Sequence, residues 1–120
     1  MVKQVGKITQ NLISKLNLKI PADTPILLGA SNIQHMKTSH PADYSKYGRY
    51  IKDILNAPDY VGINKKDGSI EYVKEYVLDN EFVKVAVRVS TNGSYFARSL
   101  YVLNNNRVNN FIQKGTLLKY

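Results

Sequence analysis

The chain has 120 residues, of which 43% are hydrophobic and 22% are charged, and its formal net charge is +8. These values fit one folded domain over residues 1–120 and leave too little chain for two cores. The absence of cysteine excludes disulfides, thiolate nucleophiles and cysteine-ligated zinc. No apolar run approaches the roughly 18 residues of a membrane span, and the amino terminus lacks a signal-peptide core, so we expect a cytoplasmic protein.

The positive charge is concentrated at the two ends of the chain. All nine acidic residues lie between Asp23 and Glu81, whereas residues 82–120 contain six cations and no acidic side chain. A field of one sign over a third of the chain attracts polyanions. The distribution therefore favours nucleic acid as the partner, although solubility alone would also explain it.

The first 30 residues predict two strands around a helix. Residues 2–8 form a short strand, and Leu12, Ile13 and Leu16 mark one side of a helix that ends at Asn17 and Pro21. The apolar run from Pro25 to Gly29 is bounded by proline and glycine, which is typical of a buried strand.

The only two histidines, His35 and His40, follow this strand directly. Imidazole is the one side chain whose unperturbed pKa lies near neutrality, so two of them can supply a base and an acid for cleaving a phosphodiester. Ser31 or Asn32 can cap a short helix that contains His35. For His35 alone, a structural role is an equal alternative.

Pro41 places His40 at the entrance of a second helix, because a residue before proline is excluded from the helical region. On one continuous helix, side chains five residues apart point about 140° away from each other, whereas a break lets them converge. A helix amino terminus also favours a phosphate over a charged imidazole. The second helix has its apolar face at Tyr44, Tyr47, Ile51, Ile54 and Leu55.

The rest of the chain predicts an antiparallel meander of four strands, at residues 60–63, 70–78, 82–90 and 95–103, with turns at 65–68, 79–80 and 91–94. Within the first turn, Lys65 and Lys66 fit a solvated turn. A short final helix starts at residues 104–106 and ends at Gly115. The expected fold class is α+β, an antiparallel four-stranded meander sheet with the N-terminal helices packed on one face and a short C-terminal helix.

The pair Asn92-Gly93 predicts a two-residue type I′ turn, because both positions accept positive φ. That turn sets Ser90 opposite Tyr95, and it gives the hairpin one valine-rich face. Its other face presents Lys84, Ala86, Arg88, Ser90, Tyr95, Ala97, Ser99 and Tyr101. Arg98 is then an anomaly, since it falls among the valines, where an unpaired charge is costly.

Cations flanked by tyrosines on this face suit a single-stranded nucleic acid. The alternative is structural: Glu75 opposite Lys84 and Glu71 opposite Arg88 would form cross-strand charge pairs without any ligand. A metal site at His35, His40 and Asp43 matches no ligand spacing, so we expect neither a metal nor a cofactor.

Five short segments resemble phage and mobile-element domains of the barnase, EndoU, colicin and RelE (BECR) nuclease group. They lie at residues 31–40, 57–61, 69–74, 87–90 and 98–101, and the resemblance spans about residues 26–118. It implies helices packed on an antiparallel sheet. It also implies a metal-independent endoribonuclease in which a ribose 2′-hydroxyl attacks the adjacent phosphate.

Carried onto this chain, the resemblance implies that His35 and His40 are the acid-base pair, with Arg98 and Ser99 also catalytic. Lys74, Arg88 and Arg98 would stabilise the phosphorane, and Ser99 or Tyr101 would donate a hydrogen bond. The expected substrate contacts are Lys74, Lys84, Arg88, Tyr95 and Tyr101.

The expected partner is RNA, either transfer RNA or another single-stranded or looped RNA, together with an inhibitor or immunity protein if the chain is a phage-derived or toxin-like effector. Two alternatives stay open. One is a noncatalytic RNA-binding or phage accessory protein that uses the same basic face. The other is an interaction protein whose charge serves only solubility.

Overall fold

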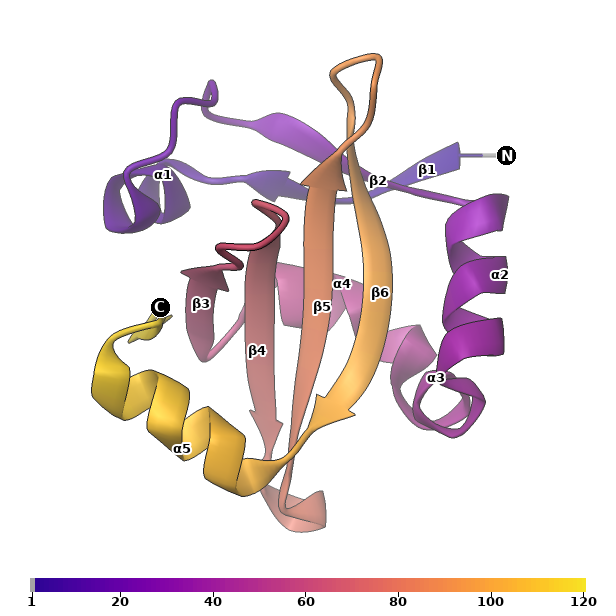
Figure 1. Cartoon of the computed structure of the whole chain (residues 1–120). Helices are drawn as coiled ribbons and strands as arrows, with labels where there is room; N and C mark the ends of the chain where they lie inside the picture. Colours follow the sequence, from indigo (N-terminus) through magenta and orange to yellow (C-terminus); the bar gives the residue numbers. More distant parts are fainter. Residues whose placement is uncertain (1) are drawn as a thin grey trace.

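The computed structural model describes residues 2–120 and has an α+β fold, as predicted (Figure 1). The helices are α1 (Gln10–Leu16), α2 (Ala30–Ser39), α3 (Pro41–Tyr47), α4 (Ile51–Asn56) and α5 (Asn105–Lys114), with 3₁₀ turns η1 (Gly48–Tyr50) and η2 (Val77–Asp79). The strands are β1 (Val2–Ile8), β2 (Thr24–Gly29), β3 (Tyr60–Ile63), β4 (Ile70–Tyr76), β5 (Glu81–Val89), β6 (Tyr95–Leu103) and β7 (Leu117–Lys119). Among residues 2–120, no helix is long and apolar enough to cross a membrane.

The sheet has seven strands in the order β1-β2-β6-β5-β4-β3-β7, so the prediction of a four-stranded antiparallel sheet was wrong in strand number. The meander of β3 to β6 is present, but both of its edges are extended. The β1–β2 hairpin joins β6 in parallel through only two residue pairs, Ile26 with Tyr95 and Leu27 with Phe96. On the other side, β7 pairs with β3, which the sequence did not reveal because three residues are too short for a periodic pattern.

Helices cover both faces of the sheet, and each face has its own apolar cluster (Figure 1). The larger cluster contains Val83, Val85 and Val87, which alternate along β5 and are fully buried against the N-terminal helices. The smaller cluster lies under α5, where Val108 packs against Val73 of β4. The sheet is therefore buried on one face and only partly covered on the other.

The β5–β6 hairpin contains a bulge that corrects the predicted register. Ala86 pairs with Ser99 as expected, but the next pair is Val87 with Ala97, so Arg98 is an extra residue on β6. Only Gly93 has a positive φ (+85°) in the turn, which rules out the predicted type I′ turn. Ser90 instead donates its N–H to the Ser94 carbonyl across a three-residue loop.

The bulge also changes which hairpin side chains are buried. Ala97 has no exposed surface and Tyr95 packs against the larger cluster, although both were predicted on the face of Lys84. Beyond the bulge, the pairing of Lys84 with Tyr101 follows the predicted register. An extra residue inverts the alternation of one strand, which explains both differences and the anomalous position of Arg98.

Helix α2 begins two or three residues earlier than predicted, because Gly29 rather than Ser31 or Asn32 is its N-cap. The Asn32 side chain accepts a hydrogen bond from the Gly29 N–H. It ends at Ser39, and its C-cap His40 has a φ of −140° and a ψ of 69°, which are not helical. Pro41 opens α3, as predicted. The expected helix over residues 41–55 is divided by η1 into α3 and α4.

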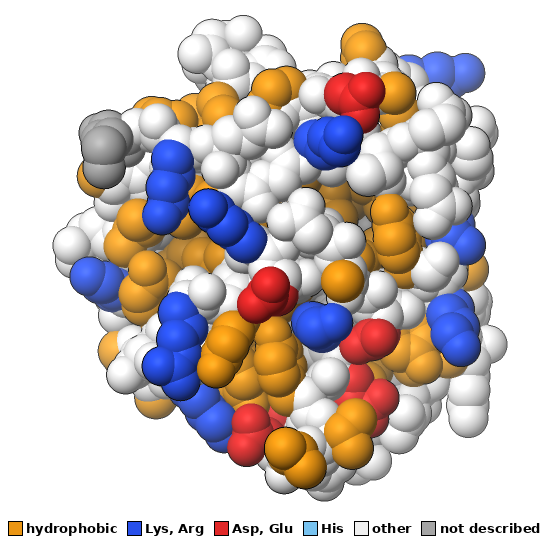
Figure 2. Space-filling view, turned by 180° about the vertical axis from the view of Figure 1, so that it is seen from behind, with side chains coloured by type: hydrophobic (Ala, Val, Ile, Leu, Met, Phe, Trp, Pro, Cys, Tyr) orange, Lys and Arg blue, Asp and Glu red, His pale blue; other side chains and the backbone are white. Residues whose placement is uncertain are grey.

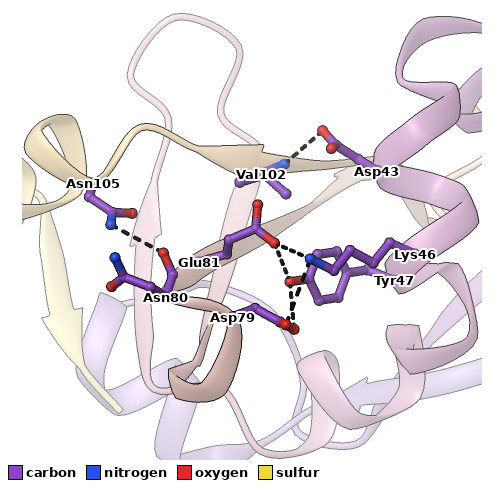
Figure 3. Close-up of polar contacts among 8 residues, drawn as sticks. All are labelled: Asp43, Lys46, Tyr47, Asp79, Asn80, Glu81, Val102 and Asn105. Carbon is purple, nitrogen blue, oxygen red and sulfur yellow. Dashed lines mark hydrogen bonds and ion pairs between the residues drawn. The ribbon is translucent and has the colours of Figure 1, made fainter.

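Asp43 attaches α3 to the sheet (Figure 3). Its carboxylate accepts a hydrogen bond of 3.0 Å from the backbone N–H of Val102, on the edge of β6 that β2 does not cover. Lys46 and Tyr47, one turn later, bind the end of the β4–β5 connection: both donate to Glu81, at 2.7 Å and 2.6 Å. Two sets of polar contacts thus fix the position of α3.

These contacts shift the pKa values of the groups involved. The hydrogen bond from Lys46, followed by that from Tyr47, holds the pKa of Glu81 below its usual value of 4.5. Burial, together with the bond to Glu81, raises the pKa of the Tyr47 hydroxyl. A carboxyl whose pKa is lowered by folding contributes stability above its unfolded pKa and loses it as the pH falls through the folded pKa.

We therefore predict that Glu81→Gln lowers the free energy of unfolding at pH 7 by roughly 1–2 kcal/mol, and that the loss is smaller near pH 3, because the Glu81 carboxylate becomes protonated as the pH falls through its lowered folded pKa. Urea unfolding at the two pH values measures the difference. The matched control is Glu75→Gln, which removes an exposed carboxylate from β4. An equal loss at both pH values would contradict the prediction.

Candidate functional site

A cleft of about 400 Å³ opens on the sheet face that α5 partly covers. Its floor includes Glu71 of β4, Lys84 of β5 and Tyr101 of β6. Cations surround the floor: Lys65 and Lys66 come from the β3–β4 turn, and Arg107 comes from α5. The cleft therefore combines a polar floor with a basic rim.

Lys84 and Glu71 form a nearly buried ion pair on this floor. The Lys84 Nζ lies 2.8 Å from a Glu71 carboxylate oxygen, and the two side chains are only 10% and 12% exposed. Burial lowers the pKa of the Lys84 ammonium, but its contacts with Glu71 and Tyr101 outweigh that effect and leave the pKa raised. Lys84 is thus a fixed positive charge at neutral pH.

Tyr101 connects this pair to His40. The Lys84 Nζ lies 4.7 Å from the centroid of the Tyr101 ring, and the His40 imidazole stacks on that ring with centroids 4.7 Å apart and an interplanar angle of 25°. The result is a continuous row across the sheet: Glu71, Lys84, Tyr101 and His40. A carboxylate, an ammonium, a phenol and an imidazole in contact can bind a phosphate and transfer protons around it.

His35 lies on α2, is exposed, and its Nε2 is 3.4 Å from the Ser39 hydroxyl. Among residues 2–120, no hydrogen bond or ring contact joins the two imidazoles. The structure therefore places His40, but not His35, in contact with a predicted substrate-binding residue.

The other predicted residues on this sheet face have different surroundings. Arg88 is 3.5 Å from Asp67 in the β3–β4 turn. Ser99 is half-buried opposite Ala86. The Nε of Arg98, at the bulge, is buried and has no hydrogen-bond partner among the described residues.

Lys74 and Tyr95 lie away from the cleft. Lys74 donates a hydrogen bond of 2.7 Å to the Ala57 carbonyl, which follows α4. Tyr95 packs against the larger apolar cluster. The structure does not bring these two predicted substrate contacts together with Lys84.

Lys84 and Arg88 both pair with carboxylates, as the structural alternative predicted, but their partners are not the predicted ones. Glu75 was expected opposite Lys84, but Val73 occupies that place, and Glu71 reaches Lys84 diagonally. Sequence reasoning also missed the rim residues Asn64 and Arg107. Their side chains join the cleft only through the packing of the turn and of α5, for which the sequence contains no local signal.

The chain belongs to the family of phage-Barnase-EndoU-ColicinE5/D-RelE like nuclease 3, whose model matches residues 3–110. The matched range includes all four residues of the row, Glu71, Lys84, Tyr101 and His40, and the β3–β4 turn that contributes Lys65 and Lys66 to the rim. Neither a curated protein nor a solved structure shows a significant match to the chain. Within residues 2–120, no group of three or more histidine and acidic side chains is arranged to hold a metal ion.

We predict that Lys84→Met lowers the free energy of unfolding by about 3 kcal/mol, because it leaves the Glu71 carboxylate buried without its partner. The double variant Lys84→Met/Glu71→Met should recover most of the loss, and urea unfolding of the four proteins in this cycle measures the coupling. Arg88→Met is the matched control. Its pair with Asp67 is nearly half exposed, so the loss should stay below about 1 kcal/mol. Additive losses in the cycle would show that the pair is not energetically coupled.

Proposed function

We propose that the chain is a metal-independent endoribonuclease that binds a single-stranded or looped RNA in the cleft and cuts it beside His40. The observation that carries the proposal is the contact of His40 with Tyr101 and of Tyr101 with the buried ammonium of Lys84. Membership of a nuclease-like family supports a nucleic acid as the substrate.

In the proposed reaction, the His40 imidazole accepts the proton of the ribose 2′-hydroxyl. The 2′-oxygen forms a bond to phosphorus, and the bond from phosphorus to the 5′-oxygen breaks after the Tyr101 hydroxyl gives that oxygen a proton. Lys84 neutralises the charge that develops on the phosphorane oxygens. The products are a 2′,3′-cyclic phosphate and a 5′-hydroxyl, and the proton held by His40 returns to Tyr101 through solvent when they leave.

The basic rim fits this role because Lys65, Lys66 and Arg107 can neutralise the phosphates on either side of the cut. Arg98 and Ser99 remain proposed contributors, since both lie on β6 within three residues of Tyr101. Lys74 and Tyr95 do not line the cleft, and their contacts are with the Ala57 carbonyl and the larger apolar cluster, so they are not part of the proposal.

We expect His40→Ala to slow the cleavage of a fluorescent single-stranded RNA in EDTA by roughly 10²- to 10⁴-fold, because an acid-base group is lost. Replacing the ribose at the cut by deoxyribose should abolish cleavage, since the nucleophile is then absent. The control is Lys114→Ala, an exposed cation of α5 outside the cleft. Wild-type cleavage by the His40 variant would refute the assignment.

The same assay with His35→Ala decides whether the two histidines act as a pair, as first expected from the sequence. A loss similar to that of His40→Ala would extend the site to α2, whereas an unchanged rate would leave His40 as the only catalytic imidazole. Relief of growth inhibition by His40→Ala in an expressing cell would support a toxin-like effector, for which an inhibitor protein is the expected partner.

A noncatalytic RNA-binding role has its own support, because Lys84 and Arg88 are both paired with carboxylates and so partly neutralised. This role predicts RNA binding without cleavage under all conditions, and binding that the substitution of His40 leaves intact.

A further inference from the structure

A second basic hollow lies on the opposite side of the molecule from the cleft. It has a volume of about 760 Å³ between the β1–β2 hairpin and helices α2, α3 and α4. Figure 2, the view from behind, shows Lys and Arg side chains gathered around apolar surface on this side. We call this hollow the rear groove.

Four cations line the rear groove: Lys3 from β1, Lys37 from α2, Arg49 from η1 and Lys52 from α4. All four are exposed, and none takes part in an ion pair within residues 2–120. No acidic residue lines the groove. Four separate elements thus contribute uncompensated positive charge to one hollow, whereas Lys7, Lys46, Lys84 and Arg88 each have a carboxylate partner.

The wall of the groove includes an aromatic ring that is held in place. Tyr44 of α3 lines the groove, and the Lys37 ammonium lies 5.8 Å from the centroid of its ring. The ring packs so closely on Gly48 that a Cβ at that position would approach it to 2.8 Å. Cations beside a fixed aromatic ring are what a single strand of nucleic acid requires, since phosphates bind the former and bases stack on the latter.

The rear groove begins next to His40, the last residue of the row Glu71, Lys84, Tyr101 and His40. His40 stacks on Tyr101, in the part of β6 that β2 does not cover, and the next residue, Pro41, lines the groove. An RNA strand with one phosphate at His40 needs only to pass over the junction of α2 and α3 to reach Lys37 and Tyr44.

We infer that the rear groove binds a single-stranded segment of RNA that flanks the segment held in the cleft. The identity of this ligand rests on the proposed function. The groove is a binding surface, and it contributes affinity for long RNA without taking part in the chemical step.

The test compares two triple variants that remove the same charge. The groove variant is Lys37→Gln/Arg49→Gln/Lys52→Gln, and the control is Lys19→Gln/Lys114→Gln/Lys119→Gln, three exposed lysines that do not line the groove. Binding of a labelled 20-nucleotide RNA and a 4-nucleotide RNA is measured against salt concentration, on the His40→Ala background so that the RNA stays intact.

For single strands each phosphate contact contributes about 0.7 to the slope of log affinity against log salt, so the groove variant should reduce the slope for the long RNA by about 2. Its affinity for that RNA should fall at least tenfold more than that of the control variant, with little change for the short RNA. When His40 is present, cleavage of the short RNA by the groove variant should match that of wild type.

An equal loss in both triple variants would show an effect of net charge alone and overturn the inference. Unchanged binding of the long RNA by the groove variant would also overturn it. Because binding is measured without cleavage, an inactive wild-type protein that still shows groove-dependent binding refutes the proposed reaction and supports the rear groove.

Discussion

The hydrogen bond from the Val102 N–H to the Asp43 carboxylate is the contact on which the arrangement of the candidate site depends. Strand β6 needs it because β2 pairs with only the first part of its edge, which leaves backbone donors without a strand partner farther along. An unpaired edge is costly when it is covered, and a helix that supplies an acceptor removes that cost. The same contact fixes the amino terminus of α3, and therefore the stacking of His40 on Tyr101.

The polar floor of the cleft illustrates how one sheet face can hold charges that are almost out of contact with water. Lys84 keeps its charge because Glu71 and Tyr101 compensate for its burial, and little of either side chain of the ion pair is exposed. Charges held in this way need no reorganisation when an anion arrives, which is the condition for strong electrostatic stabilisation. The exposed lysines of the rim, Lys65 and Lys66, have the opposite character, since charges at the surface act on a ligand from a distance.

The elements that depend on nearby residues were predicted from the sequence, whereas those that depend on contacts between distant segments were not. Pro41, Gly115 and the alternating valines of β5 each act within a few residues, and the structure agrees with them. The edge strand β7, the parallel contact of β2 with β6 and the extra residue at Arg98 depend on contacts between distant segments, so no pattern in one segment reveals them. The candidate site divides in the same way. The hairpin register predicted Lys84 and Tyr101 on one face, whereas the pairing of Glu71 with Lys84, in place of Arg88, and the position of Arg107 depend on the packing of the sheet and of α5.

The bulge at Arg98 separates the hairpin into two parts with independent registers. From Ala86 and Ser99 toward Lys84 and Tyr101, the residues pair in one register, while from Val87 and Ala97 toward the turn the pairing is shifted by the extra residue Arg98. Insertions or deletions in the loop at residues 90–94, which lies beyond the last strand pair, can therefore be absorbed without displacing the row of four residues. A lineage of such proteins could vary the hairpin tip to meet different targets or neighbours while the chemical centre stays the same.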